Sequence, residues 1–122
     1  MFRVLALTEE NGLYAGVRDF VKKDSGDIRI ITYSSTVDLL EKFSAMHTDL
    51  VILDVDILDD QAIKLINILR SIKKDSRIML ILSKDKMAIC SAAFSLGIVS
   101  YLVKPITTEN LYEIISSVLL KH

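Results

Sequence analysis

Residues 49–60 read DLVILDVDILDD and carry the strongest fold signal in the sequence. Leu50 to Leu53 is an unbroken apolar run, which is typical of a strand buried on both faces of a parallel sheet. A carboxylate inside such a strand is costly, so we expect Asp54 to stand where the strand ends, with its side chain reaching water. In open α/β sheets, ligands bind at the carboxyl ends of the strands. The stretch therefore predicts a buried strand that delivers Asp54 to a binding rim.

Composition narrows the class of protein. The chain has 122 residues, which predicts one domain over residues 1–122. Its formal net charge of −1 argues against nucleic acid as a direct ligand. The one cysteine, Cys90, has no partner for an internal disulfide, so we expect a reducing, cytoplasmic setting. The apolar run at the N-terminus is too short for a signal peptide or a membrane span, and we expect no membrane association.

Outward from residues 49–60, apolar strands alternate with amphipathic helices. We expect strands at 3–7, 28–33, 50–54, 77–82 and 99–103, and helices at about 11–24, from Ser35, at 60–73, at 86–96 and from Thr107. Ser35 with Asp38 resembles a capping box, and Gly97 is the expected stop of the fourth helix. The predicted buried helix faces are Leu13, Val17, Phe20 and Val21; Leu39, Leu40, Phe43 and Met46; Ala62, Leu65, Ile66, Leu69 and Ile72; Ile89, Ala92, Ala93 and Leu96; and Leu111, Ile114, Ile115, Val118 and Leu119.

This alternation predicts an α/β fold. Five strands joined by right-handed helical crossovers give a doubly wound, five-stranded parallel sheet with five helices, in the flavodoxin-like order 2-1-3-4-5. The point where the strand order reverses then lies between the first and third strands. The residues expected at this rim are Thr8, Glu9, Glu10, Asp54, Asp56, Ser83 and Lys104.

The expected rim combines carboxylates, a hydroxyl and an ammonium. Carboxylates with a backbone carbonyl suit Mg²⁺. Aspartate is a nucleophile in aspartyl-phosphate formation, and charge neutralisation with positioning is what phosphoryl transfer requires. Taken singly, Asp54 is more often a helix cap, Lys104 a solvated cation and Ser83 a loop hydroxyl. Their order along the strand ends favours phosphoryl chemistry, and it places Lys104 within ion-pair reach of Asp54.

Three segments carry a family resemblance. LVILD ends at Asp54, LILS ends at Ser83, and AFSLGIVSYLVKP contains Tyr101, Lys104 and Pro105. In these segments the chain resembles the receiver domain of two-component response regulators, over essentially its whole length. The resemblance implies that Asp54 is the phosphoacceptor, with Lys104 as its cationic partner. It also implies that Ser83 is the switch hydroxyl and Tyr101 the switch aromatic, and that the Lys104–Pro105 peptide is cis.

The same resemblance implies a cofactor, partners and a mode of action. Mg²⁺ would be held by Glu9, Asp54 and the backbone carbonyl of Asp56. A histidine kinase or phosphotransfer protein would supply the phosphoryl group, so the reaction is self-modification and the chain is not an enzyme. Phosphorylation would change the surface formed by the fourth helix, the fifth strand and the fifth helix. That surface would engage an output domain or effector protein, and its apolar residues would favour a homodimer.

Departures from the family pattern keep alternatives open. The first strand ends in Thr8–Glu9, with Glu10 one step later, where two acids are usual; residues 57–62 lack the usual Pro and Gly; and Lys84 stands where a small residue is usual. These features suit a pseudo-receiver, an interaction module that is not phosphorylated. Residues 53–56 also resemble the DxD motif of haloacid-dehalogenase-type phosphatases. That family places DxD on its first strand and needs a later acidic pair, so we disfavour this alternative.

Overall fold

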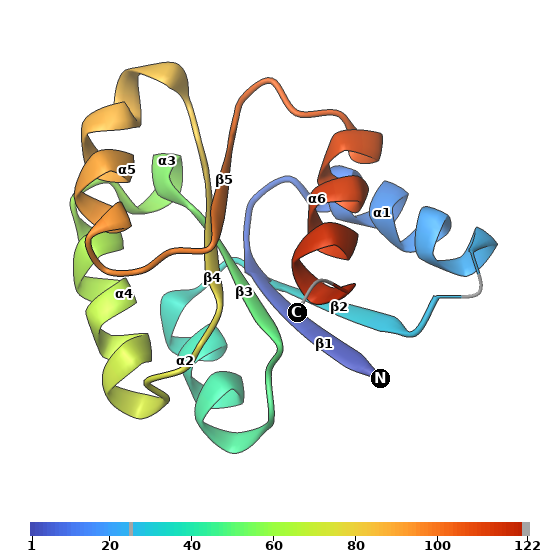
Figure 1. Cartoon of the computed structure of the whole chain (residues 1–122), viewed down its shortest axis with the longest axis horizontal. Coiled ribbons are helices and arrows are strands. Elements are labelled where there is room, and N and C mark those ends of the chain that lie inside the picture. Colours follow the sequence, from blue (N-terminus) through green and yellow to red (C-terminus); the bar gives the residue numbers. More distant parts are fainter. Residues whose placement is uncertain (25, 121–122) are drawn as a thin grey trace.

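A five-stranded parallel sheet forms the centre of the molecule, in the order β2-β1-β3-β4-β5 (Figure 1). The computed structural model describes residues 1–24 and 26–120. The strands are β1 (Phe2–Leu7), β2 (Ile28–Tyr33), β3 (Leu50–Asp54), β4 (Ile78–Leu82) and β5 (Ser100–Val103). The predicted fold class and strand order are confirmed. Asp54 is the last residue of the central strand, as expected.

Helices cover both faces of the sheet. They are α1 (Asn11–Lys23), α2 (Thr36–Ala45), α3 (Val55–Leu58), α4 (Gln61–Ile72), α5 (Met87–Phe94) and α6 (Thr108–Leu120), with a 3-10 turn, η1 (Lys84–Lys86), before α5. Figure 1 shows α2, α3, α4 and α5 on one side of the sheet and α1 with α6 on the other. Among the described residues, no helix combines the length and apolar character needed to cross a membrane.

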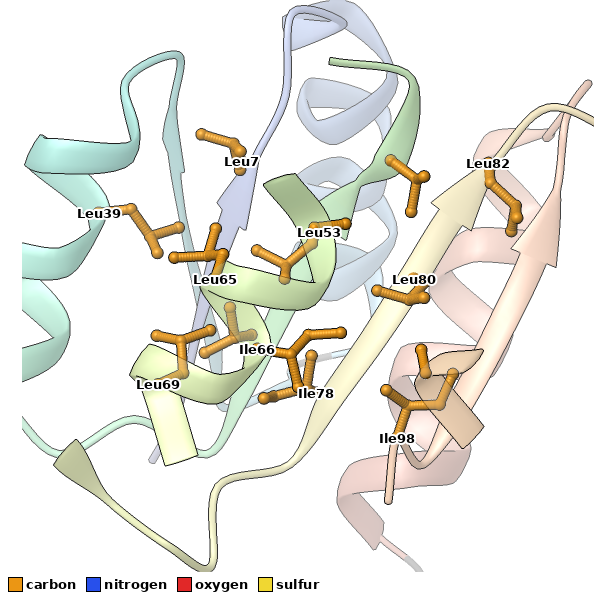
Figure 2. Close-up of a cluster of buried hydrophobic side chains, with 14 of the residues drawn as sticks. Leu7, Leu39, Leu53, Leu65, Ile66, Leu69, Ile78, Leu80, Leu82 and Ile98 are labelled. Atoms are coloured by element: carbon orange, nitrogen blue, oxygen red, sulfur yellow. The ribbon is translucent and has the colours of Figure 1, made fainter. Parts of the chain in front are cut away.

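Alternate residues of the strands feed two separate cores, because successive side chains of a strand point to opposite faces. Val51 and Leu53 face the α2–α5 side, whereas Leu50 and Ile52 face α1 and α6. All four side chains are buried. Figure 2 shows the larger core, in which Leu53 and Leu80 of the sheet meet the apolar side chains of α2 and α4. This burial on both faces explains the unbroken apolar run.

Local signals fix several helix ends as predicted. The Ser35 hydroxyl accepts a hydrogen bond from the Asp38 backbone N–H at 3.4 Å, and the Thr107 hydroxyl accepts one from Asn110 at 3.0 Å. Gly97 has a φ of 79°, a conformation that costs glycine little. Its carbonyl accepts a hydrogen bond from the Arg70 guanidinium at 2.8 Å. These contacts fix the starts of α2 and α6 and the end of α5.

Some helix predictions were wrong. The structure has the additional one-turn helix α3 directly after β3, because the Asp54 side chain caps a new helix there. Ile72, at the last turn of α4, is 41% exposed, and Ala92 is also exposed. Tyr14 of α1 and Cys90 of α5, which were not among the predicted buried residues, lie in the core. In the almost wholly apolar α5 the sequence offers no polar face, so periodicity could not tell which side packs on the sheet.

Helices α1 and α6 approach each other closely. A Cβ atom added to Gly16 would lie 2.6 Å from the Thr108 side chain, so this contact requires glycine. The rings of Phe20 and Tyr112 stack, with centroids 5.4 Å apart, and the Tyr112 hydroxyl donates a hydrogen bond to Asp24. The first and last helices therefore form one packed layer.

Candidate functional site

Asp54 lies at the carboxyl end of the sheet, where β3 passes directly into α3. Its Oδ1 atom accepts a hydrogen bond from the Asp56 backbone N–H at 3.0 Å and so caps the short helix. The residue is only 4% exposed. The expectation that its side chain reaches water was therefore wrong. A buried carboxylate needs a compensating charge, and a lysine supplies it.

Lys104, directly after β5, is that partner. Its Nζ atom lies 3.1 Å from Oδ1 and 2.9 Å from Oδ2 of Asp54, which confirms the predicted ion-pair reach. The same atom lies 3.0 Å from Oδ2 of Asp56. Burial opposes the charged form of Lys104, but the hydrogen bonds to Asp54 and Asp56 outweigh it and raise the pKa of the ammonium. The Lys104–Pro105 peptide is cis, as the resemblance implied.

The Asp56 side chain binds Ser83 as well as Lys104. The Ser83 backbone N–H donates to Oδ1 of Asp56 at 3.1 Å, and the Ser83 hydroxyl donates a short hydrogen bond to Oδ2. Burial works to raise the pKa of Asp56, but the Ser83 hydroxyl and then Lys104 outweigh it, so the pKa lies below the usual range. The sequence suggested only a backbone carbonyl role for Asp56. The structure makes its carboxylate a central member of the site.

The end of β1 contributes less to the rim. Thr8 is buried, and its hydroxyl accepts a hydrogen bond from the Glu10 backbone N–H at 2.8 Å. Glu9 is exposed. Glu10, which was expected at the rim but not among the metal ligands, brings Oε2 to 3.8 Å from Lys104 Nζ. The acids after β1 therefore stand at the edge of the site.

The donor set is a poor fit for Mg²⁺ in this arrangement. Over residues 1–24 and 26–120, no three acidic, histidine or cysteine side chains lie close enough together to hold a metal ion. Every carboxylate oxygen of Asp54 and Asp56 already contacts Lys104, Ser83 or a backbone N–H. Lys104 thus supplies the positive charge that a metal would bring to these oxygens.

Three neighbouring features complete the surroundings of the site. A cleft of about 670 Å³ lies beside Lys104, lined by Glu10, Gly12, Leu13, Lys104, Pro105 and Ile106. On β5, the ring of Tyr101 meets Phe94 edge to face, with centroids 5.6 Å apart. Lys84 is exposed, while Lys86 forms an ion pair with Asp59. The cleft borders Lys104, and Tyr101 of β5 packs against α5 through Phe94.

Comparison with known proteins agrees with the fold and the resemblance described above. The family model for the response regulator receiver domain matches residues 4–116. The sensory transduction protein LytT of Bacillus cereus is 26% identical over 114 residues, which are 93% of this chain and 45% of that protein. The chain thus spans less than half the length of this relative.

Solved structures share the fold. The non-phosphorylated HemR receiver domain from Leptospira biflexa has a TM-score of 0.83 at 17% identity, covering 100% of this chain and 97% of that one. The response regulator TrrA of Thermotoga maritima, solved in complex with Mg²⁺ and BeF, has a TM-score of 0.74 at 23% identity, covering 98% and 100%. Because the family model spans almost the whole sheet and every strand end of the rim, this chain belongs to the response regulator receiver domain family.

Proposed function

We propose that the chain is a phosphoacceptor receiver whose Asp54 takes a phosphoryl group from a phosphohistidine. The observation that carries the proposal is the position of Lys104 Nζ, 2.9 to 3.1 Å from both Asp54 oxygens. A single ammonium at this place neutralises charge as a phosphoryl group arrives, and such neutralisation is the main requirement of the reaction.

The transfer is a displacement at phosphorus. One Asp54 oxygen forms the new P–O bond while the P–N bond of the donor breaks, and the leaving imidazole takes the electron pair and gains a proton. Lys104 then contacts both the aspartyl group and the phosphoryl oxygens. The Ser83 hydroxyl donates a hydrogen bond to a phosphoryl oxygen, which draws the end of β4 toward Asp54.

The response is carried by the surface of α5, β5 and α6. Tyr101 changes its packing against Phe94 as Ser83 moves, and the change is recognised by an output domain or an effector protein. Phe94 and Val99 are 50% and 44% exposed on this surface, which favours a homodimer of the phosphorylated form. Sedimentation with and without beryllofluoride tests this part, and an unchanged monomer would remove the dimer.

Intact mass tests the acceptor. Acetyl phosphate or phosphoramidate with Mg²⁺ should add one phosphoryl group to the wild type and none to Asp54→Asn. Asp60→Asn, which neutralises an exposed acid of the same loop, is the matched control and should label as the wild type does. Equal labelling of the wild type and Asp54→Asn would show that another residue is modified.

A pseudo-receiver is the second candidate. It is favoured by the full occupation of the Asp54 and Asp56 oxygens by protein donors and by the uncharged Thr8 at the end of β1. In that case the wild type takes up no phosphoryl group at any concentration of donor and Mg²⁺, while its surface still binds a partner protein.

A further inference from the structure

The Asp56 carboxylate holds three donors that a phosphoryl group would use. The Ser83 N–H lies 3.1 Å from Oδ1, the Ser83 hydroxyl donates to Oδ2, and Lys104 Nζ lies 3.0 Å from Oδ2. Residue 56 is half-buried, so these contacts are partly shielded from water. The sequence alone does not predict these contacts of the Asp56 side chain with Ser83 and Lys104.

A carboxylate and a phosphoryl group bind the same kinds of hydrogen-bond donors. Both are anions whose oxygens accept charge-assisted hydrogen bonds from ammonium, hydroxyl and amide donors. Lys104 already neutralises Asp54, so its single positive charge is shared between Asp54 and Asp56, with Glu10 farther away at 3.8 Å. A phosphoryl group on Asp54 would convert its carboxylate into an uncharged acyl group and place a more highly charged anion at the same ammonium. It gains Ser83 and Lys104 only if Asp56 releases them.

We propose that the Asp56 carboxylate is a built-in competitor of the phosphoryl group. In the unmodified protein it occupies the Ser83 and Lys104 donors, and it must turn away before an anion on Asp54 can bind them. Asp56 is thus a positioning residue that acts through Ser83 and Lys104, and it sets how strongly the site takes an anion. The inference rests on the proposed phosphoacceptor function for its role in signalling, but the competition itself is a property of anion binding.

Inorganic phosphate is the direct probe. Titrations followed by the backbone amide resonance of Ser83 should show about tenfold tighter binding to Asp56→Asn than to the wild type, the effect of releasing one charge-assisted hydrogen bond. Asparagine keeps the size and shape of the side chain. Glu10→Gln removes a carboxylate that is also close to Lys104 but does not contact Ser83, and it should change the affinity much less.

A double-mutant cycle separates competition from a simple change of charge. If Asp56 acts by occupying Ser83, the gain from Asp56→Asn should shrink in a Ser83→Ala background, because the contested donor is gone. Equal gains in both backgrounds, or equal phosphate affinity of the wild type and Asp56→Asn, would overturn the inference. Thermal unfolding of each variant confirms that the compared proteins are folded.

Intact mass keeps this test apart from that of the proposed function. With acetyl phosphate, Asp56→Asn should label faster than the wild type at the same donor concentration. If neither protein is labelled, the phosphoacceptor function fails, and the phosphate titration still decides on the competition. If both are labelled at the same rate and bind phosphate equally, the function stands and the competition fails.

Discussion

The residues after β3 and the residues after β1 both bring acids to the same rim, but they are held very differently. After β3, Asp54 and Asp56 contact Lys104, and Asp59 pairs with Lys86. After β1, Glu9 is exposed and Glu10 comes only to 3.8 Å from Lys104. The contrast shows that the number of acids near a rim does not give the number of free ligands. Acids that already have partners contribute charge balance, and they are less available to a metal than loosely held ones.

Removing Lys104 should have the largest effect on stability and signalling, because Lys104 is the partner of both Asp54 and Asp56. Lys104→Ala leaves the buried Asp54 without its cation, and the loss of one partner of a buried pair costs about 3 kcal/mol of unfolding free energy. The protein should still fold but lose most of the change linked to phosphorylation. Urea unfolding measures the loss of stability, and sedimentation with and without beryllofluoride measures the change linked to phosphorylation. The control is Lys84→Ala, at an exposed lysine of the same rim. This variant should keep the stability of the wild type and its change on phosphorylation.

Asp49 extends the comparison to a held acid outside the rim. Burial opposes ionisation of Asp49, but a 2.7 Å hydrogen bond from the Arg3 backbone N–H and the contact with His47 outweigh it, so its pKa lies below the ordinary value of 3.8. A lowered pKa contributes stability above pH 4 that is lost as the pH falls through the folded-state pKa. Asp49→Asn should therefore cost about 1 kcal/mol near neutral pH.

Unfolding measured from pH 7 to pH 2 checks this prediction. The difference between wild type and Asp49→Asn should shrink toward zero at the acid end, where both side chains are uncharged. Asp75→Asn, at an exposed acid, serves as the control and should follow the wild type at every pH. A deficit of Asp49→Asn that stays constant down to pH 2 would show that packing, and not charge, is responsible.

Replacing Asp59 should raise the stability of the protein, in contrast to the two changes above, because the backbone of Asp59 is strained. Its φ of 49° and ψ of −129° suit glycine and disfavour other residues. Asp59→Gly should raise the unfolding free energy by about 1 kcal/mol, since the lost ion pair with Lys86 is exposed and contributes little. Asp60→Gly is the control. Asp60 has a right-handed φ of −63°, so glycine should bring no gain there.

Changes to Glu9, one of the loosely held acids after β1, should have the smallest effect. We expect weak Mg²⁺ binding by the wild type, because Glu9 must join Asp54 and the Asp56 carbonyl without help from the uncharged Thr8. Glu9→Gln should weaken it further. The double change Thr8→Asp with Glu9→Asp should strengthen it several-fold. NMR titration with Mg²⁺ measures all three proteins, and equal affinities would mean that the acids after β1 take no part.

The alternation of strands and helices could be predicted because it depends on local patterns and on burial of whole strands. The position of Asp54 at a strand end followed from the cost of a charge inside a sheet. The role of the Asp56 carboxylate could not be predicted, because it depends on contacts with Ser83 and Lys104 far along the chain. The start of a helix directly at Asp54 was also hidden, since an apolar and acidic stretch of four residues carries no clear period.

The close packing of α1 and α6 has a consequence during synthesis of the chain. Asp24 and Tyr112, which join the two helices, are 88 positions apart. The apolar side of α1, with Tyr14 and Val17, therefore leaves the ribosome long before Leu111 and Ile115 of its covering helix exist. A nascent chain that ends before α6 leaves exposed the part of this sheet face that α6 covers, and such surface is what chaperones bind and what aggregates. Synthesis of α6 is thus the step that covers this apolar surface.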